Sequence, residues 1–323
     1  MKAVVCHKYG SPDVLEVEEV QTPSPGDDEV LIRVHAASAN ALDWRLLRAD
    51  PFFIRLAGLG FWSPKHKILG ADVAGTVEAV GNNVRRFVPG DEVFGDVMPT
   101  GMGGFAEYVC TREDRLTTKP DTLTFEEAAA VPVAAVTAVQ GLRDHGRIQA
   151  GHKVLITGAG GGVGTFAVQI AKALGAEVTG VCSTGKLELV RSLGADRVID
   201  YTREDPIEDG TRYDLIFDVA AYRSILDYRQ ALGPDGIYVM VGGATIRFFQ
   251  FLLLKPWMAL TKQMKLVAFV AESTSAELDT LKAMLESGAI KPVIGRRHTL
   301  AEVPDALRYV EQGHTTGKVV VAM

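Results

Sequence analysis

Residues 153–186 read KVLITGAGGGVGTFAVQIAKALGAEVTGVCSTGK, and this stretch decides the fold of the central part of the chain. It opens with residues 154–157, an apolar and β-branched run between Gly151 and Gly158, which predicts a buried parallel strand. A glycine-rich turn follows, and apolar residues then recur at helical spacing up to Gly175, which is typical of the position just after a helix. Residues 177–182 predict a second strand, so the stretch forms a βαβ unit.

Three glycines, Gly158, Gly161 and Gly164, stand three residues apart in the turn. In a dinucleotide-binding fold such glycines allow a tight turn, let backbone N–H groups approach a pyrophosphate, and let the helix pack on the sheet. The helix N-terminus then offers free donors and the positive end of its dipole. A tight turn without a ligand is the alternative, but the order strand, turn, helix, strand favours dinucleotide binding. We expect the cofactor to be held by Gly161, Gly162, Val163 and Gly164.

The second predicted strand ends at Cys182, where an NAD-binding site usually carries Asp or Glu for the adenosine ribose hydroxyls. Ser183, Thr184 and Lys186 follow instead. With no acid to repel it, a 2′-phosphate would find two hydroxyls and an ammonium, which favours NADPH over NADH. The alternative is an ordinary turn into a helix, for which Ser and Thr are common caps.

Composition and charge narrow the class of protein. The chain has 323 residues, of which 47% are apolar, enough for the cores of two domains. Its net charge is −6 and it has no long run of Lys or Arg, so nucleic acid is not expected as a partner. Cys6, Cys110 and Cys182 lack CxxC spacing, which indicates a reducing compartment. The N-terminus does not read as a signal peptide, and we expect a cytoplasmic protein.

The rest of the chain divides into two patterns. Residues 1–121 are rich in short strands and turns, with one helix expected over residues 41–48, and indicate a β-barrel-like domain. Residues 122–270 begin with two helices separated at Pro132 and then alternate strands with helices, which predicts a doubly wound parallel sheet. The expected strands cover residues 154–157, 177–182, 197–200, 213–219, 237–241 and 266–270, with helices over residues 187–193 and 225–232. Helices over residues 275–287 and 301–312 and a strand over residues 318–322 follow.

Together these motifs resemble the medium-chain dehydrogenase/reductase superfamily, in its zinc-independent quinone oxidoreductase-like branch. The resemblance covers the whole chain and rests on GADVAG at residues 70–75, PGDEVFG at residues 89–95, GAGGGVG at residues 158–164 and GHTTGKVVV at residues 313–321. It implies a GroES-like catalytic domain formed by residues 1–121 and 271–323 and a Rossmann domain over residues 122–270, with the active site in the cleft between them.

Zinc-binding members of that superfamily place a Cys near Asn40, a His-Glu pair at Ala71-Asp72 and a further ligand near Ala134. None of these metal ligands is present here, because Asn40 and Ala71 cannot replace a thiolate and an imidazole, so we expect no metal. The resemblance then implies hydride transfer from NADPH to a quinone or an α,β-unsaturated carbonyl, a small molecule that spreads the charge it receives. Two alternatives stay open: reduction of an enoyl thioester or another biosynthetic enone, and a low-turnover NADPH-binding sensor. Arg45, where many relatives carry Tyr, keeps the sensor open.

The resemblance also assigns roles to individual residues. Asn40 and Asp43 match its N-x-x-D positions, where Asn40 would donate to a substrate oxygen and Asp43 would hold the nicotinamide ribose. A turn cap and an exposed helix acid are the alternatives for these two residues. Further contacts to NADPH are implied for Thr137, Tyr201, Gly242, Gly243, Phe269, Val270 and Lys318. A buried hydroxyl, a surface aromatic and an edge-strand lysine are the alternatives for Thr137, Tyr201 and Lys318.

Residues 247–265, RFFQFLLLKPWMALTKQMK, are not part of the common motifs. Their apolar part is interrupted at Lys255 and is too short to span a bilayer. One interpretation is a helix buried at a domain or homodimer interface. The other is a surface that docks on a membrane to collect a lipid-like quinone or enal, flanked by Arg247, Lys255, Lys262 and Lys265.

Overall fold

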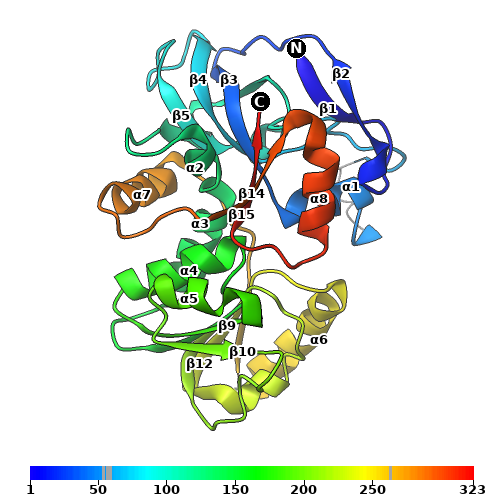
Figure 1. The fold of residues 1–323 in the computed structure, drawn as a ribbon. Helices are drawn as coiled ribbons and strands as arrows, with labels where there is room; N and C mark the ends of the chain where they lie inside the picture. The colour runs from blue at the N-terminus through cyan, green and yellow to red at the C-terminus, as the bar shows by residue number, and fades with distance from the viewer. Residues whose placement is uncertain (53–54, 56–59, 262–263) are drawn as a thin grey trace. The chain divides into compact units, whose positions relative to one another are not determined.

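A computed structural model describes residues 1–52, 55, 60–261 and 264–323 (Figure 1). These residues form two compact units. Unit 1 consists of Met1–Val133, Ser273–Gly288 and Pro292–Met323, and unit 2 of Ala134–Glu272 and Ala289–Lys291.

The observed division lies later in the chain than the predicted boundary at residue 121. Residues 122–133 belong to unit 1, because α2 (Phe125–Ala129) packs against β3 (Glu29–Ala39) and β4 (Asp72–Val80). The α2 helix begins with a capping box, in which the Thr124 side chain accepts from the Glu127 N–H. On the C-terminal side, unit 1 resumes at Ser273 instead of residue 271.

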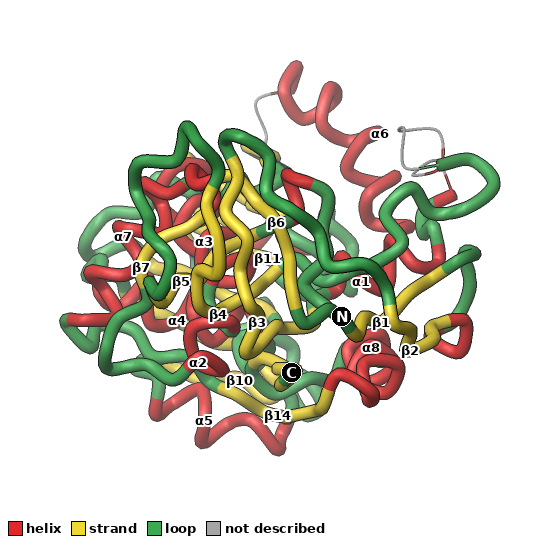
Figure 2. Tube along the Cα trace, turned by 90° about the horizontal axis from the view of Figure 1, so that it is seen from above, coloured by secondary structure: helices red, strands yellow, loops and turns green. Residues whose placement is uncertain are grey.

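Unit 1 is built on a seven-stranded sheet of order β14-β15-β3-β4-β5-β7, in which β6 also pairs with β3. Figure 2 shows β3 between β4 and β6. The pairs are antiparallel, except that β14 and β15 run parallel. The further strands are β5 (Glu92–Asp96), β6 (Tyr108–Arg112), β7 (Leu116–Thr118), β14 (Ile294–Thr299) and β15 (Lys318–Ala322), and β1 (Lys2–Cys6) and β2 (Leu15–Glu19) form a separate two-stranded sheet.

The long strand β3 leads directly into the candidate site of unit 1. Val30, Ile32 and Val34 alternate along it and pack into one hydrophobic core cluster. The chain leaves β3 at Asn40 and enters α1 (Ala41–Arg48), which has the predicted bounds. The helices α7 (Ser275–Glu286) and α8 (Val303–Glu311) complete unit 1.

Unit 2 contains the predicted doubly wound parallel sheet. Its order is β10-β9-β8-β11-β12-β13, which is the strand order of dinucleotide-binding folds. The strands are β8 (Lys153–Thr157), β9 (Glu177–Cys182), β10 (Arg197–Asp200), β11 (Tyr213–Asp218), β12 (Leu232–Met240) and β13 (Lys265–Ala268). The helices of this part of the chain are α3 (Pro132–Val139), α4 (Gly162–Ala173), α5 (Leu187–Ser192) and α6 (Thr245–Thr261).

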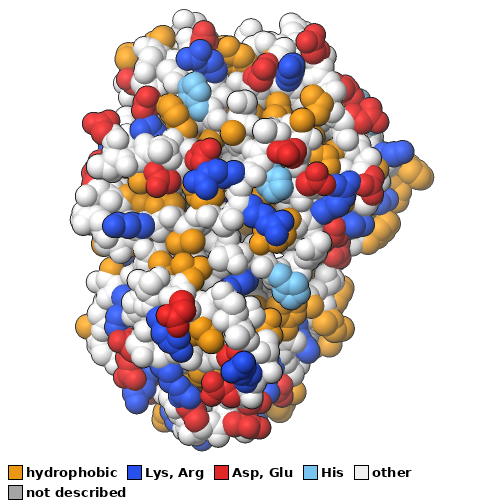
Figure 3. Space-filling model, viewed as in Figure 1, with side chains coloured by type: hydrophobic (Ala, Val, Ile, Leu, Met, Phe, Trp, Pro, Cys, Tyr) orange, Lys and Arg blue, Asp and Glu red, His pale blue; other side chains and the backbone are white. Residues whose placement is uncertain are grey.

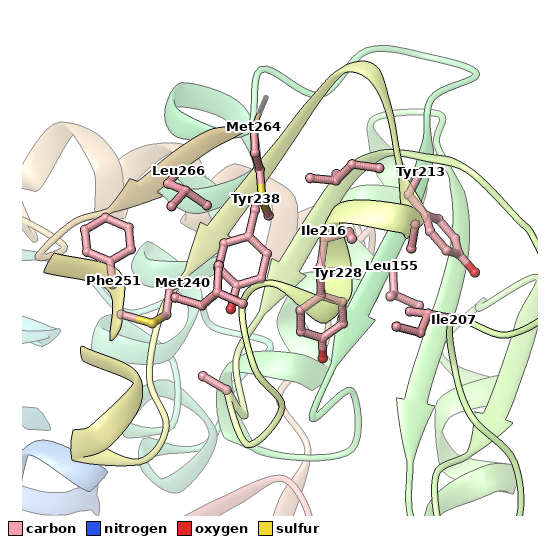
Figure 4. Close-up of a cluster of buried hydrophobic side chains, with 14 of the residues drawn as sticks. Leu155, Ile207, Tyr213, Ile216, Tyr228, Tyr238, Met240, Phe251, Met264 and Leu266 are labelled. Carbon is pink, nitrogen blue, oxygen red and sulfur yellow. The ribbon is translucent and has the colours of Figure 1, made fainter. Parts of the chain in front are cut away.

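A hydrophobic cluster in unit 2 joins α6 to the sheet. Figure 4 shows Phe251 of α6 beside Met240 of β12 and Leu266 of β13, all three buried. In the same cluster the rings of Tyr228 and Tyr238 lie 5.5 Å apart. One face of α6 is therefore anchored in the core of unit 2. Within the described residues, no helix is both long enough and apolar enough to cross a lipid bilayer.

Two elements differ from the sequence prediction in kind. The helix expected over residues 225–232 is only a 3₁₀ turn at Asp227–Ala231, because β12 already begins at Leu232. The strand β14 was not predicted, since its exposed residues Arg296 and Arg297 hide the alternation of an edge strand. Lys255 interrupts the apolar run of residues 247–265 as predicted, and α6 continues through Lys255 and Pro256 as one helix.

Candidate functional site

The glycine-rich turn of unit 2 brings bare backbone to the start of α4. Gly158 follows β8 with φ +63°, a conformation that favours glycine. A Cβ on Gly164 would clash with the carbonyl oxygen of Gly158 and lie 2.7 Å from the Cα of Ala159, so only glycine allows this approach. Gly161 is the N-cap residue of α4 and has extended backbone. This turn has the side-chain-free cradle that a pyrophosphate needs at a helix N-terminus.

Lys186 lies just after β9 in the sequence, and its side chain extends over the glycine-rich turn. Its Cδ would be 2.7 Å from a Cβ placed on Gly160, so the lysine side chain packs on the glycine backbone. Burial lowers the pKa of Lys186. The structure therefore brings the glycine turn together with Lys186, one of the residues predicted to recognise a 2′-phosphate.

An acid that the sequence analysis missed lies in the same region. Asp200, at the end of β10, pairs with Cys182 in the register of the sheet. Its Oδ2 accepts from Thr184 Oγ1 at 2.5 Å, and its Oδ1 accepts from the N–H of Thr202 at 3.0 Å. These hydrogen bonds, led by that of Thr184, hold the pKa of Asp200 below its ordinary value. Arg203 Nε lies 3.7 Å from the same carboxylate. The pairing of β9 with β10, rather than any local motif, puts Asp200 there.

Except for Thr137, the other predicted cofactor residues of unit 2 follow strands of the same parallel sheet. Because parallel strands share one carboxyl edge, residues that follow them gather at that edge. Thr137 lies in α3 and is half-buried. The ring of Phe269 packs on that of His145, with ring centroids 4.3 Å apart. The remaining residues follow β10, β12 and β13 in turn: Tyr201, then Gly242 and Gly243, then Val270.

A second missed residue, Asp218, ties the loops after β8 and β11 together. It is fully buried and accepts from Thr157 Oγ1, from the Ala221 N–H at 2.8 Å and from Tyr238 Oη at 2.6 Å. Burial raises the pKa of Asp218. Ala221 has φ +41°, so these hydrogen bonds hold a loop in a conformation that is unfavourable for alanine.

In unit 1, three strands bring Asn40, Asp72 and Lys318 together. In the registers of β4 and β15 on β3, Ser38 lies opposite Asp72 and Ala39 opposite Val319, so the start of each strand comes to the end of β3. Lys318 Nζ donates to Asn40 Oδ1 at 2.6 Å and to Asp72 Oδ2 at 3.1 Å. The Asp72 carboxylate is fully buried and the Lys318 side chain is 3% exposed. Lys318, expected to contact NADPH, is thus enclosed within unit 1.

The carboxylate of Asp72 has a full set of donors. Besides Lys318, its Oδ2 accepts from Ser38 Oγ at 2.6 Å and from Asn40 Nδ2 at 2.9 Å, and its Oδ1 accepts from the Val133 N–H at 2.8 Å. The second amide contact of Asn40 is longer, 3.4 Å to the carbonyl oxygen of Ser38. This network fixes the orientation of the Asn40 amide, because an ammonium can face only its oxygen.

The Asp43 side chain is buried next to this network, so Asp43 is not the exposed helix acid of the alternative interpretation. Its Oδ2 accepts from the Asn40 N–H at 2.7 Å and its Oδ1 from the Gly70 N–H at 3.1 Å, and the residue has no exposed surface. Burial raises its pKa from its ordinary value near 3.8 to about 7. In this structure Asp43 therefore holds Asn40 and the start of α1 in place, and its side chain does not reach the surface, where a ribose would be bound.

The buried carboxyl of Asp43 predicts a specific pH dependence of stability. Because its folded pKa lies above its unfolded pKa, its contribution to the free energy of unfolding falls as the pH rises from about 4 to about 7. We expect the difference in the free energy of unfolding between wild type and Asp43→Asn to change by up to about 4 kcal/mol over that range. Urea unfolding at a series of pH values measures it, and a constant difference would contradict the assignment.

The described residues contain no group of three or more His, Cys, Asp or Glu side chains placed to hold a metal ion. At the positions compared with the zinc ligands, the Asn40 amide and the Asp72 carboxylate are bound to the Lys318 ammonium. That buried positive charge would repel a second cation at this place.

The barrel-like sheet of unit 1 and the glycine cradle of unit 2 define a two-unit, dinucleotide-binding dehydrogenase fold. Two family models match: the alcohol dehydrogenase GroES-like domain over residues 26–121 and zinc-binding dehydrogenase over residues 193–321. The chain belongs to the medium-chain dehydrogenase/reductase superfamily, in its quinone oxidoreductase-like branch.

Individual relatives support this assignment over nearly the whole chain. The 2-methylene-furan-3-one reductase of Solanum lycopersicum is 36% identical in an alignment of 332 positions, which covers 99% of this chain and 79% of that protein. The chloroplastic NADPH-dependent alkenal/one oxidoreductase of Arabidopsis thaliana is 35% identical, over 99% of this chain and 79% of that protein. The structure of the quinone oxidoreductase from Coxiella burnetii aligns with a TM-score of 0.88 at 29% identity, covering 100% of this chain and 99% of that one.

Proposed function

We propose that this chain is an NADPH-dependent reductase of quinones or α,β-unsaturated carbonyls that works without a metal ion. The buried Lys318–Asn40–Asp72 network carries the proposal, because it places an ammonium where zinc members of the superfamily bind their metal. Relatives named for reduction of an alkenal or alkenone and of a methylene-furanone support the substrate class.

The proposed hydride transfer requires few chemical groups from the protein itself. NADPH, when bound, supplies the hydride. Quinones and α,β-unsaturated carbonyls delocalise the negative charge that they receive, so no Lewis acid is required, and water can supply the proton. The chain's own residues bind, orient and exclude water. We assign the pyrophosphate to the backbone at Gly161, Gly162, Val163 and Gly164. This leaves the 2′-phosphate to Ser183 and Lys186, because the predicted third contact, Thr184, already donates its hydroxyl proton to Asp200.

Asn40 is the proposed donor to the substrate oxygen. Its oxygen is held by Lys318, so its amide protons point the other way, toward Asp72 and the carbonyl of Ser38. The 3.4 Å contact to Ser38 is long for a hydrogen bond and can be exchanged for a substrate oxygen. Lys318 and Asp43 act as positioning residues, since both are buried and both bind Asn40.

The proposed function is tested by turnover of purified protein treated with a chelator. We expect oxidation of NADPH with 1,4-benzoquinone, 9,10-phenanthrenequinone or 2-alkenals, at a rate that chelation leaves unchanged. Loss of turnover on chelation and its return with zinc would contradict the metal-free mechanism. Tight NADPH binding without turnover on any acceptor would favour the sensor or an enoyl-thioester substrate.

The preference for NADPH is tested at Lys186. We expect Lys186→Ala to weaken binding of adenosine 2′,5′-bisphosphate about tenfold, because one charge-assisted contact to the 2′-phosphate is lost. Binding of 5′-AMP, which has no 2′-phosphate, should be unchanged in calorimetric titration. Lys172→Ala is the matched control, since Lys172 Nζ binds Asp196 at 2.7 Å. An equal loss for both nucleotides would instead show that Lys186 only supports the glycine turn.

The state of the cysteines supports the proposed cytoplasmic location. Cys6, Cys110 and Cys182 are all free thiols. Burial raises the pKa of each thiol to about 11. Unpaired cysteines of this kind are typical of proteins kept in a reducing compartment.

A further inference from the structure

The exposed face of α6 does not select one of the two partners expected for it. Figure 3 shows hydrophobic side chains gathered over the region that α6 occupies in Figure 1. Two lysines expected to flank them have other neighbours: Lys255 Nζ lies 5.6 Å from the ring centroid of the buried Phe251, and Lys265 Nζ lies 3.8 Å from Asp235 Oδ1. Lys262 lies outside the described residues. The membrane surface and the homodimer interface therefore both stay predictions.

The buried carboxylate of Asp218 lies where the strand order of unit 2 reverses, at the end of β11. The sheet continues from β8 to β9 and β10 on one side, and from β11 to β12 and β13 on the other. A dinucleotide crosses such a sheet at the reversal, with one half on each side. The glycine turn and Lys186 belong to the first side, which leaves the loops after β11, β12 and β13 to the nicotinamide half.

Asp218 and Thr157 join the two sides of the sheet at this point. They lie opposite each other in the register of β11 and β8, and Thr157 Oγ1 donates its proton to Asp218 Oδ1. The oxygen of the same hydroxyl accepts from the Ala220 N–H at 3.2 Å, while Asp218 Oδ1 accepts from the Ala221 N–H at 2.8 Å. Because the carboxylate takes the proton of Thr157, the hydroxyl oxygen is oriented to accept. Two successive N–H groups of the loop after β11 are thus held by this pair of side chains.

The loop after β11 packs in turn against the loop after β12. A Cβ on Gly243 would lie 2.6 Å from the carbonyl oxygen of Ala220 and 2.8 Å from that of Ala221, so the two loops meet with no room for a side chain. Gly243 is one of the residues expected to contact NADPH. Ala221 has φ +41°, a costly conformation for alanine, and the hydrogen bond from its N–H to Asp218 offsets that cost. The shape of both loops therefore depends on Asp218.

We propose that Asp218 is a positioning residue that holds the loop after β11 in place for the nicotinamide half of NADPH. The proposal rests on the proposed function, because it names the residue that orders one half of that cofactor. Asp218 is fully buried, so it acts through Ala220 and Ala221 and does not touch the cofactor. The adenosine half, which lies on the other side of the reversal, does not depend on this loop.

The proposal is tested by comparing NADPH with adenosine 2′,5′-bisphosphate, which lacks the nicotinamide half. We expect Asp218→Ala to weaken NADPH binding about tenfold in calorimetric titration, because a loop released from its hydrogen bonds must be ordered again when the nicotinamide binds. Binding of the bisphosphate should be unchanged. The fluorescence of the reduced nicotinamide, which rises when the ring is held away from water, provides a second readout. At saturating NADPH this rise should be smaller in Asp218→Ala than in wild type.

Thr157→Val is a second test variant, which decides the question if Asp218→Ala does not fold. It keeps the shape of the side chain and removes the hydroxyl between Asp218 and the Ala220 N–H, so it should also weaken binding of NADPH alone. Asp218→Asn is the conservative variant. Its amide oxygen can accept from the Ala221 N–H and its NH₂ group can donate to Tyr238 Oη, so it should recover most of the affinity for NADPH.

Tyr238→Phe is the matched control for a loss of stability. Tyr238 Oη donates to Asp218 Oδ2 at 2.6 Å from the core of unit 2, and none of the loop's hydrogen bonds to Asp218 and Thr157 involves it. The change should therefore lower the thermal stability of unit 2 and leave the affinities for both nucleotides as they are in wild type.

Three outcomes would overturn the proposal. Equal losses for NADPH and the bisphosphate would show that the network supports unit 2 as a whole, and affinities that match wild type in both test variants would show that the loop keeps its place without it. A Tyr238→Phe protein that loses NADPH binding alone would separate the effect from the loop. Every readout is binding or fluorescence, so a chain that binds NADPH and reduces no acceptor would contradict the proposed function and leave the role of Asp218 intact.

Discussion

Replacing Lys318 with Met is expected to destabilise unit 1 by about 3–5 kcal/mol, because the change leaves Asp72 as an uncompensated buried charge. Met has nearly the same length and volume, so the effect reports charge more than a cavity. The change also removes the donor to Asn40 Oδ1, which frees the amide to turn. We therefore expect a lower kcat with quinones in addition to the loss of stability.

The effect of Lys318→Met on stability should be measured in each unit separately, because two units need not unfold in one step. Amide hydrogen exchange in peptides from β3, β4 and β15 reports unit 1, and peptides from β8 and β11 provide an internal reference. We expect faster exchange in the first set alone. Arg297→Met is the surface control, because the Arg297 side chain is 61% exposed and its pair with Glu126 should contribute less than about 1 kcal/mol.

A double variant separates charge from packing at this site. Asp72→Asn together with Lys318→Met removes both buried charges and should recover part of the stability lost in Lys318→Met. If Lys318→Met were as mild as Arg297→Met, the buried pair would not hold unit 1 together.

Gly164→Ala is expected to destroy the cofactor site of unit 2. Its Cβ would meet backbone atoms, among them the carbonyl oxygen of Gly158, and backbone cannot move aside as a flexible side chain can. The start of α4 must then shift away from the turn, at a cost of about 1–3 kcal/mol in stability. We expect NADPH binding about a hundredfold weaker by calorimetric titration, equivalent to about 2.7 kcal/mol.

The matched control for Gly164→Ala is Gly185→Ala. A Cβ on Gly185 would meet no atom within 4 Å, so this change should leave the stability of unit 2 unchanged. A Gly164→Ala protein that kept both its stability and its NADPH affinity would show that the close approach of α4 is not required.

Local patterns were sufficient where one stretch carries its own signals. The strands β10 and β15 and the helix α1 have the bounds that alternation, turn residues and caps predict. The doubly wound parallel sheet of unit 2 was also predicted, from one βαβ motif and the alternation of strands and helices after it. Prediction failed at β14, whose polar sequence becomes a strand only because β15 is available to pair with it.

The candidate site was predictable only in part, for a related reason. The motifs of the sequence singled out Asn40, Asp43 and Lys318. They did not predict that Lys318 binds Asn40, which is 278 positions away in the sequence. That contact depends on the registers of β4 and β15 on β3, which no local pattern records. Asp200 was missed in the same way, because it reaches Thr184 through the pairing of β10 with β9.

The place of β15 in the sheet has a consequence for synthesis on the ribosome. Residues 36–39 of β3 pair with β15 on the edge opposite β4, so this edge stays open until residues 318–322 have been translated. All of unit 2 lies within residues 134–291 and leaves the ribosome earlier. Unit 1 thus begins first and is completed last, and a nascent chain that stops before residue 318 exposes an unpaired strand edge to aggregation and to chaperones.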